Sequence, residues 1–207
     1  MPWIIMSISF FINLVIGTFF VDEVMYTGGI ATIHIYMLVI GITNVTQTFS
    51  FAIGFSVKRF DYFFGTTATI GGVSLVNAVL LWLMGVTEAA TQGWGSDLHF
   101  FHLPYVSDGT AIAQIWFHFA IMLCCFFIGF LFPCIYRRFG TIGLYAFSIA
   151  LVAVASISMF LIGYYEKWPA LFEALGSLSA AALAGWAFAL ALLLALSSCL
   201  LLRRSTN

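Results

Sequence analysis

The chain has 207 residues, of which 63% are apolar and 7% are charged, and its formal net charge is -1. Soluble domains carry about 25% charged residues, because their surfaces must be hydrated. This composition excludes a water-soluble enzyme, a nucleic-acid-binding protein and a disordered chain, and it indicates a protein whose solvent is lipid.

Six apolar stretches are long enough to cross a membrane, since a helix needs about 20 residues to span roughly 30 Å of hydrocarbon. Backbone polar groups cannot face lipid unpaired, and the strands of a barrel would be about 10 residues long with alternating polarity. The sequence therefore predicts an all-α fold, with residues 1–207 forming a single transmembrane domain that is a bundle of six transmembrane helices. In chain order, these spans are 3–21, 30–54, 63–86, 111–134, 142–163 and 179–202.

Charged residues between the spans predict how the bundle is oriented. Six of the seven basic residues follow the even-numbered spans as three pairs: Lys58 and Arg59, Arg137 and Arg138, Arg203 and Arg204. The alternate connections hold Lys167 and most of the acidic residues: Asp22, Glu23, Glu88, Asp97, Asp108, Glu166 and Glu173. By the positive-inside rule, we expect the loops at 55–62 and 135–141 and both termini to be cytoplasmic.

The second and third predicted spans carry polar residues along one helix face each. Such faces avoid lipid, and two interpretations remain open for them. Small and hydroxyl-bearing residues let helices approach closely and hydrogen-bond, so the faces can serve packing alone. Alternatively, four of their residues line a polar translocation pathway: Asn44, Gln47, Ser74 and Asn77.

The connection between these two spans is the most specific local feature of the chain. Aromatic residues surround Lys58, Arg59 and Asp61 there in greater number than a positive-inside anchor requires. A surface of this composition suits the groove of a cytoplasmic partner. The predicted contact residues are Val57, Lys58, Arg59, Phe60, Asp61 and Tyr62, with Phe60 and Tyr62 as the anchors.

Motifs for catalysis are not found. The chain has no Gly-rich P-loop ending in Gly-Lys-Ser/Thr, and with Lys58 and Lys167 as its only lysines we expect any ATP hydrolysis to occur on another protein. Glu88 is interpreted as an interfacial carboxylate at the outer end of the third span. We expect no catalytic residue, no cofactor and no metal site.

The four histidines offer an alternative, because His34, His99, His102 and His118 all fall in the outer half of the predicted bundle. At a spacing of three, His99 and His102 would share one helix face, as metal or haem ligands do. Against this, no cysteine or second carboxylate has ligand spacing, and histidines are common at membrane interfaces.

The last outer connection, residues 164–178, is half apolar and contains Trp168, Phe172 and charged residues. Pro169 and Gly176 are typical of the start and the end of a helix. The sequence therefore predicts a short helix that lies in the membrane interface.

The run from Ser56 to Thr66, Ser-Val-Lys-Arg-Phe-Asp-Tyr-Phe-Phe-Gly-Thr, resembles the junction of the second and third spans in small ABC-2-type transporter permeases. Two further motifs are similar to the same family: Glu88-x-x-Thr91-x-Gly93-Trp94-Gly95 and Tyr136-Arg137-Arg138-Phe139-Gly140. The resemblance implies a pair of six-helix membrane subunits, identical or homologous, each contacting a separate ABC ATPase through a coupling helix at 55–65.

On this resemblance we expect a non-catalytic permease subunit of an exporter in a bacterial plasma membrane. The short outer loops and the absence of charged residues on the polar faces favour a hydrophobic or amphipathic substrate, and the composition argues against nucleic acid as a partner. Two other functions remain open. One is a membrane redox or metal protein that uses the outer histidines, and the other is a non-transporting subunit that recruits or senses a cytoplasmic protein.

Overall fold

The computed structural model describes residues 2–20, 24–102, 104–107 and 109–203, and helices dominate it. Five of these helices are long and apolar enough to cross a membrane, which confirms an all-helical membrane protein. They are α1 (Pro2–Phe20), α2 (Ala31–Gly54), α3 (Arg59–Ala90), α5 (Ala111–Tyr164) and α7 (Ala180–Arg203). The short elements are β1 (Met25–Tyr26), η1 (Gly93–Gly95), β2 (Leu98–His99), α4 (Pro104–Ser107) and α6 (Trp168–Ser177).

The predicted fourth and fifth spans both lie within α5, which has 54 residues. A straight helix of that length would measure about 80 Å, far more than a bilayer. Its direction changes at Gly140, where φ is 70° and ψ is -165°, a backbone conformation that glycine adopts most readily. The prediction of a loop at 135–141 is therefore wrong, because a single residue makes the turn. The number of membrane crossings and the side of each terminus stay predictions.

The first part of α5 forms the centre of the bundle, where it packs between α2 and α7. Two glycines set its approach to α2. A Cβ atom at Gly41 would overlap the carbonyl oxygen of Phe126, and one at Gly129 would overlap that of Leu38. Small residues allow helices to pack closely in lipid, so α2 and α5 make backbone contact across these positions.

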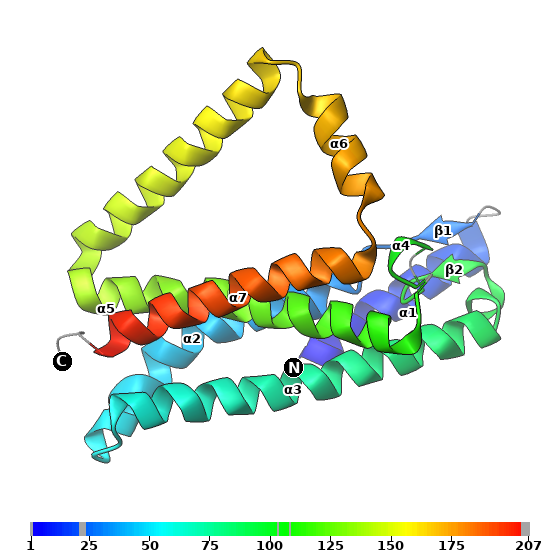
Figure 1. Ribbon diagram of the computed structural model, residues 1–207. Helices are drawn as coiled ribbons and strands as arrows, with labels where there is room; N and C mark the ends of the chain where they lie inside the picture. The colour runs from blue at the N-terminus through cyan, green and yellow to red at the C-terminus, as the bar shows by residue number, and fades with distance from the viewer. Residues whose placement is uncertain (1, 21–23, 103, 108, 204–207) are drawn as a thin grey trace.

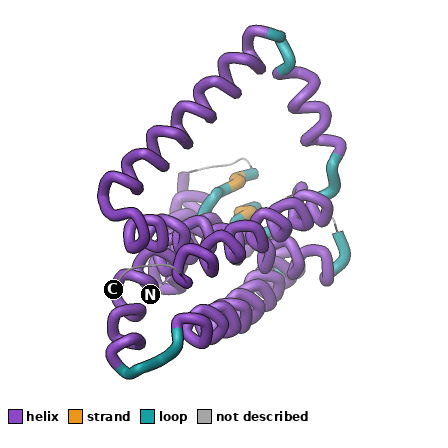
Figure 2. Tube along the Cα trace, turned by 60° about the vertical axis from the view of Figure 1, so that its left-hand side comes forward, coloured by secondary structure: helices purple, strands orange, loops and turns teal. Residues whose placement is uncertain are grey.

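The part of α5 beyond Gly140 leaves the bundle and is followed by α6, which leads back to α7 (Figures 1 and 2). Its side chains are mostly exposed, as expected of an apolar helix that faces lipid. The short helix predicted in the last outer connection is confirmed as α6. Trp168 and Phe172 stack on its surface with their ring centroids 6.0 Å apart.

A small cap that the hydrophobic pattern does not indicate lies at the end of the bundle where α7 begins (Figure 1). There, β1 and β2 pair in parallel, with Met25 opposite Leu98 and Tyr26 opposite His99. Strands of two residues are too short for an alternating pattern to be recognised in the sequence.

The other end of the bundle holds the α2–α3 turn, the bend in α5 and the end of α7 (Figure 1). The described basic residues of the three predicted pairs all lie there, so the clustering of basic residues at one end is a feature of the fold. Four charges used to predict the orientation lie outside the described residues: Asp22, Glu23, Asp108 and Arg204.

Candidate functional site

The turn between α2 and α3 comprises residues 55–58 and is closed by backbone hydrogen bonds. Ser56 has a left-handed conformation, with φ of 61°, and its N–H donates to the Ile53 carbonyl over 2.9 Å. The Val57 N–H donates to the Ala52 carbonyl over 3.2 Å. A left-handed residue after the last turn is a common helix terminator, since it satisfies carbonyls that the helix leaves free.

No separate coupling helix lies between α2 and α3. Instead, α3 begins at Arg59, four residues before the predicted span at 63, and Lys58 precedes it in an extended conformation. Asp61 lies in the first turn of α3, where a negative charge stabilises the positive end of the helix dipole. Arg59 and Phe60 are therefore held on a rigid helix end.

Four phenylalanines form an exposed aromatic patch around this turn: Phe51, Phe55, Phe60 and Phe64. Their exposed fractions are 69%, 69%, 60% and 52%. They stand as two pairs. Phe51 of α2 and Phe55 of the turn have ring centroids 4.7 Å apart, and Phe60 and Phe64 of α3 have centroids 4.4 Å apart. Such a patch, flanked by cations, is typical of a protein interface or of a membrane surface.

Tyr62 faces into the bundle, with 8% of its surface exposed. Its hydroxyl donates to Asn44 Oδ1 over 2.7 Å and lies 2.8 Å from Thr48 Oγ1. The prediction of Tyr62 as a surface anchor is therefore wrong. In a helix that begins at Arg59, Phe60 and Phe64 share an outward face, so Tyr62 turns toward α2.

Arg137 ties α5 to the end of α2. Its Nη2 donates to Ser50 Oγ over 2.7 Å and to the Val45 carbonyl over 3.3 Å. The guanidinium also lies over the Phe49 ring, 4.7 Å from the centroid. Because Phe49 in turn contacts Tyr62 edge to face, α2, α3 and α5 are joined in one network beside the turn.

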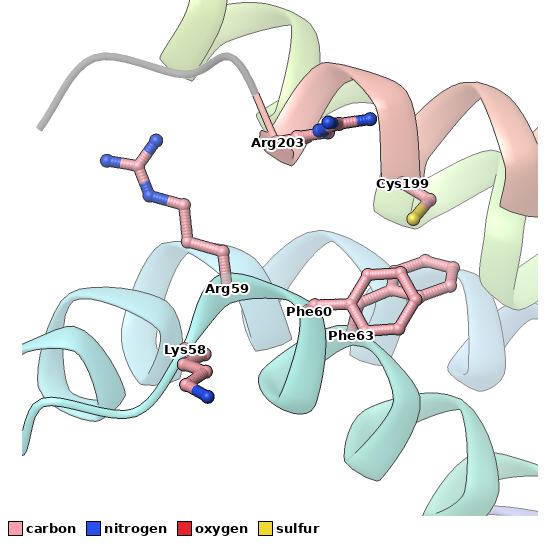
Figure 3. A pocket seen from close by; sticks show the side chains of 6 residues that line it. All are labelled: Lys58, Arg59, Phe60, Phe63, Cys199 and Arg203. Carbon is pink, nitrogen blue, oxygen red and sulfur yellow. The ribbon is translucent and has the colours of Figure 1, made fainter.

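A pocket of about 380 Å³ lies between the start of α3 and the end of α7 (Figure 3). Figure 3 shows the Phe60 and Phe63 rings in the space between the two helices, close to Cys199. Three cationic residues complete its lining: Lys58, Arg59 and Arg203. An apolar floor with a cationic rim suits a ligand or a partner segment that is both apolar and acidic.

The four residues of the predicted translocation face lie in different surroundings. Asn44 accepts the Tyr62 hydroxyl, and Asn77 Oδ1 accepts Trp3 Nε1 over 3.0 Å, which joins α1 to α3. Ser74 is fully buried and its hydroxyl has no hydrogen-bond partner among the described residues, whereas Gln47 is exposed. Two of the four therefore hold helices together, and their role in translocation stays a prediction.

The histidines form two separate pairs. His34 and His118 lie within the bundle with ring centroids 5.5 Å apart, and His99 and His102 lie in the cap with centroids 6.2 Å apart. His99 belongs to β2, so the shared helix face predicted for His99 and His102 is wrong. Among the described residues, no group of three or more His, Cys, Asp or Glu side chains is arranged to hold a metal ion.

Glu88 is the residue whose role the sequence least reveals. It is fully buried within the protein, which its interpretation as an interfacial carboxylate did not anticipate. Its carboxylate accepts the backbone N–H groups of Phe100, Phe101 and His102 over 2.8–3.1 Å and Trp94 Nε1 over 3.1 Å. Glu88 and Trp94 of this motif therefore meet in the cap, and the Glu88 carboxylate is its central acceptor.

No protein-family model, curated protein or solved structure matches this chain. The most distinctive surface of the chain is the basic end of the bundle, where exposed aromatic side chains and cations surround a turn that is tied to the central helix.

Proposed function

We propose that this chain is the membrane subunit of an ATP-driven transporter of the ABC-2 type, and that a separate ATPase docks on the aromatic patch. It works with a second membrane subunit in a bacterial plasma membrane and exports a hydrophobic or amphipathic substrate. The observation that carries the proposal is the exposed, paired arrangement of the four phenylalanines beside Lys58 and Arg59.

The chemistry of this surface fits a protein partner with an apolar groove and an acidic rim. Exposed aromatic side chains are the residues that contribute most to interface affinity when a partner desolvates them. The neighbouring cations favour an acidic partner and orient it during encounter, because charge complementarity contributes mainly to association rate and register. Phe60 is placed to be the central contact, since it follows Arg59 in the chain and its ring contacts that of Phe64.

A docked ATPase can move the bundle only if its contacts with the turn differ between its nucleotide states. The network behind the turn would carry such a displacement inward. Tyr62 joins the start of α3 to α2, and Arg137 joins the end of α2 to α5. A shift of the turn would therefore move α2, α3 and α5 together.

A subunit that recruits a cytoplasmic protein without transport is the second candidate. The engagement of Asn44 and Asn77 in interhelical hydrogen bonds favours it, since these amides then serve packing and do not line a polar pathway. Both candidates use the aromatic patch. ATP-dependent movement of substrate across the membrane separates them.

The test is affinity capture of the tagged full chain from native membranes, followed by measurement of the ATPase activity that it retains. We expect Phe60→Ala and Arg59→Glu to lower the captured activity at least about tenfold, the loss of a typical interface anchor. Phe172→Ala on α6 is the matched control, because Phe172 has an exposed fraction of 65% and lies outside the patch.

Equal amounts of each variant in the membrane show that insertion is intact. The proposal is contradicted if the wild-type chain captures no ATPase activity, or if both patch variants capture as much as the wild type does. If capture depends on the patch but vesicles show no ATP-dependent flux, the recruitment function replaces the transporter.

A further inference from the structure

A second hollow lies at the same end of the bundle, where α5 bends. Because Gly140 turns the chain, the two parts of α5 diverge, and the later part stands away from α7 (Figure 1). A groove of about 580 Å³ lies between both parts of α5 and the end of α7. Its lining is mainly apolar and includes Leu131, Ile135, Phe147 and Leu200.

Of the described residues that line this groove, Arg138 alone is charged. Its guanidinium lies 4.9 Å from the centroid of the Phe139 ring. No carboxylate of the described residues lies within ion-pair distance of it. The neighbouring Arg137, in contrast, is bound to α2. Arg138 is thus a half-buried cation beside an apolar groove, with no counter-ion among the residues that the structure describes.

The chemistry of the groove distinguishes a lipid from a polypeptide. A bound peptide segment would need partners for its backbone N–H and C=O groups, and in an apolar setting each unpaired group is costly. The groove offers two polar side chains, Ser197 and Arg138. An acyl chain needs no such partners, and a phosphate group accepts the paired N–H donors of a guanidinium.

We propose that this groove binds one anionic phospholipid, with its phosphate on Arg138 and an acyl chain against Phe147 and Leu200. Basic pockets between membrane helices bind acidic headgroups in this way. The lipid would fill the space that the bend at Gly140 leaves and support the diverging part of α5 against α7. An anionic lipid is favoured because this end of the bundle holds five described basic residues and one described acidic residue, Asp61.

The experiment uses the full chain, purified in mild detergent and exposed to an equal mixture of phosphatidylglycerol and phosphatidylcholine. Native mass spectrometry counts the lipids that each molecule retains. We expect one phosphatidylglycerol per wild-type chain, retained in preference to phosphatidylcholine. Arg138→Gln should weaken this retention about fivefold, the effect of one basic side chain near an acidic headgroup.

Two further variants complete the design. Arg203→Gln makes the same change of charge at the same end but outside the groove, so it should lower retention clearly less than Arg138→Gln does. Leu200→Trp fills the groove without changing charge and should lower retention as Arg138→Gln does. This variant also tests the proposal if Arg138→Gln cannot be purified.

Retention of neither lipid overturns the proposal, as does equal retention of both lipids by the wild type. An equal loss in Arg138→Gln and Arg203→Gln also overturns it, since general surface charge would then explain binding. The measurement needs no ATPase, so its outcome is independent of the function proposed above.

Discussion

Replacing Glu88 with alanine removes the carboxylate on which the cap is organised. Four N–H donors converge on it, three from the backbone and one from Trp94. The N–H groups of Phe100 and Phe101 are buried, so Glu88→Ala leaves both without this acceptor. A buried donor left unpaired costs about 1–3 kcal/mol, and two such groups cost about 2–6 kcal/mol.

For a chain of this length, a loss of that size lowers the melting temperature by about 5–20 °C. The assay is thermal unfolding of the purified protein in detergent, with Glu88→Ala compared with Glu173→Ala, because Glu173 is an exposed carboxylate on α6. Glu88→Gln should fall between the wild type and Glu88→Ala. Its amide keeps one oxygen acceptor, but its NH₂ group faces donors.

A local measurement separates the cap from the rest of the bundle. Hydrogen exchange of the amides in residues 93–102 should become faster in Glu88→Ala at temperatures where the long helices remain protected, since the cap then opens by itself. A melting temperature within about 1 °C of that of Glu173→Ala, together with unchanged exchange in 93–102, would refute the role of this carboxylate.

Two further perturbations test the basic end. Gly140→Ala should destabilise the protein by about 1–3 kcal/mol, because alanine is strained at the positive φ of this position. Gly65→Ala is the control, since a Cβ atom there meets no neighbouring atom and should cost nothing. Thermal unfolding compares the two variants, and equal melting temperatures would contradict the bend. Tyr62→Phe should cost about 1 kcal/mol through the lost hydrogen bond to Asn44, whereas Tyr145→Phe at an exposed position should cost nothing. A double-mutant cycle of Tyr62→Phe with Asn44→Ala measures this coupling, and additive effects would show that the bond contributes nothing.

The amino-acid sequence alone determined the solvent and the class of fold. Long apolar runs have to be helices in lipid, since each helix satisfies its own backbone, and this requirement acts within a single segment. The α6 helix was likewise predictable from Pro169, Gly176 and the residues between them. The aromatic residues beside Lys58 and Arg59 could also be recognised, because their number exceeds what a positive-inside anchor requires and is a local property of the sequence.

The tertiary structure decided which residues of these segments meet. From the sequence, Glu88 is interpreted as an interfacial carboxylate. In the structure the chain folds back and brings the N–H groups of Phe100 and Phe101 to it. From the sequence, Tyr62 is predicted to be a surface anchor. In the structure the start of α3 directs its hydroxyl toward Asn44. The bend at Gly140 follows from a backbone angle that the apolar pattern does not encode. Two of these features depend on hydrogen bonds between residues far apart in the chain, and the third on the backbone angles of one glycine. Hydrophobic periodicity carries no information on either, so only the folded chain reveals them.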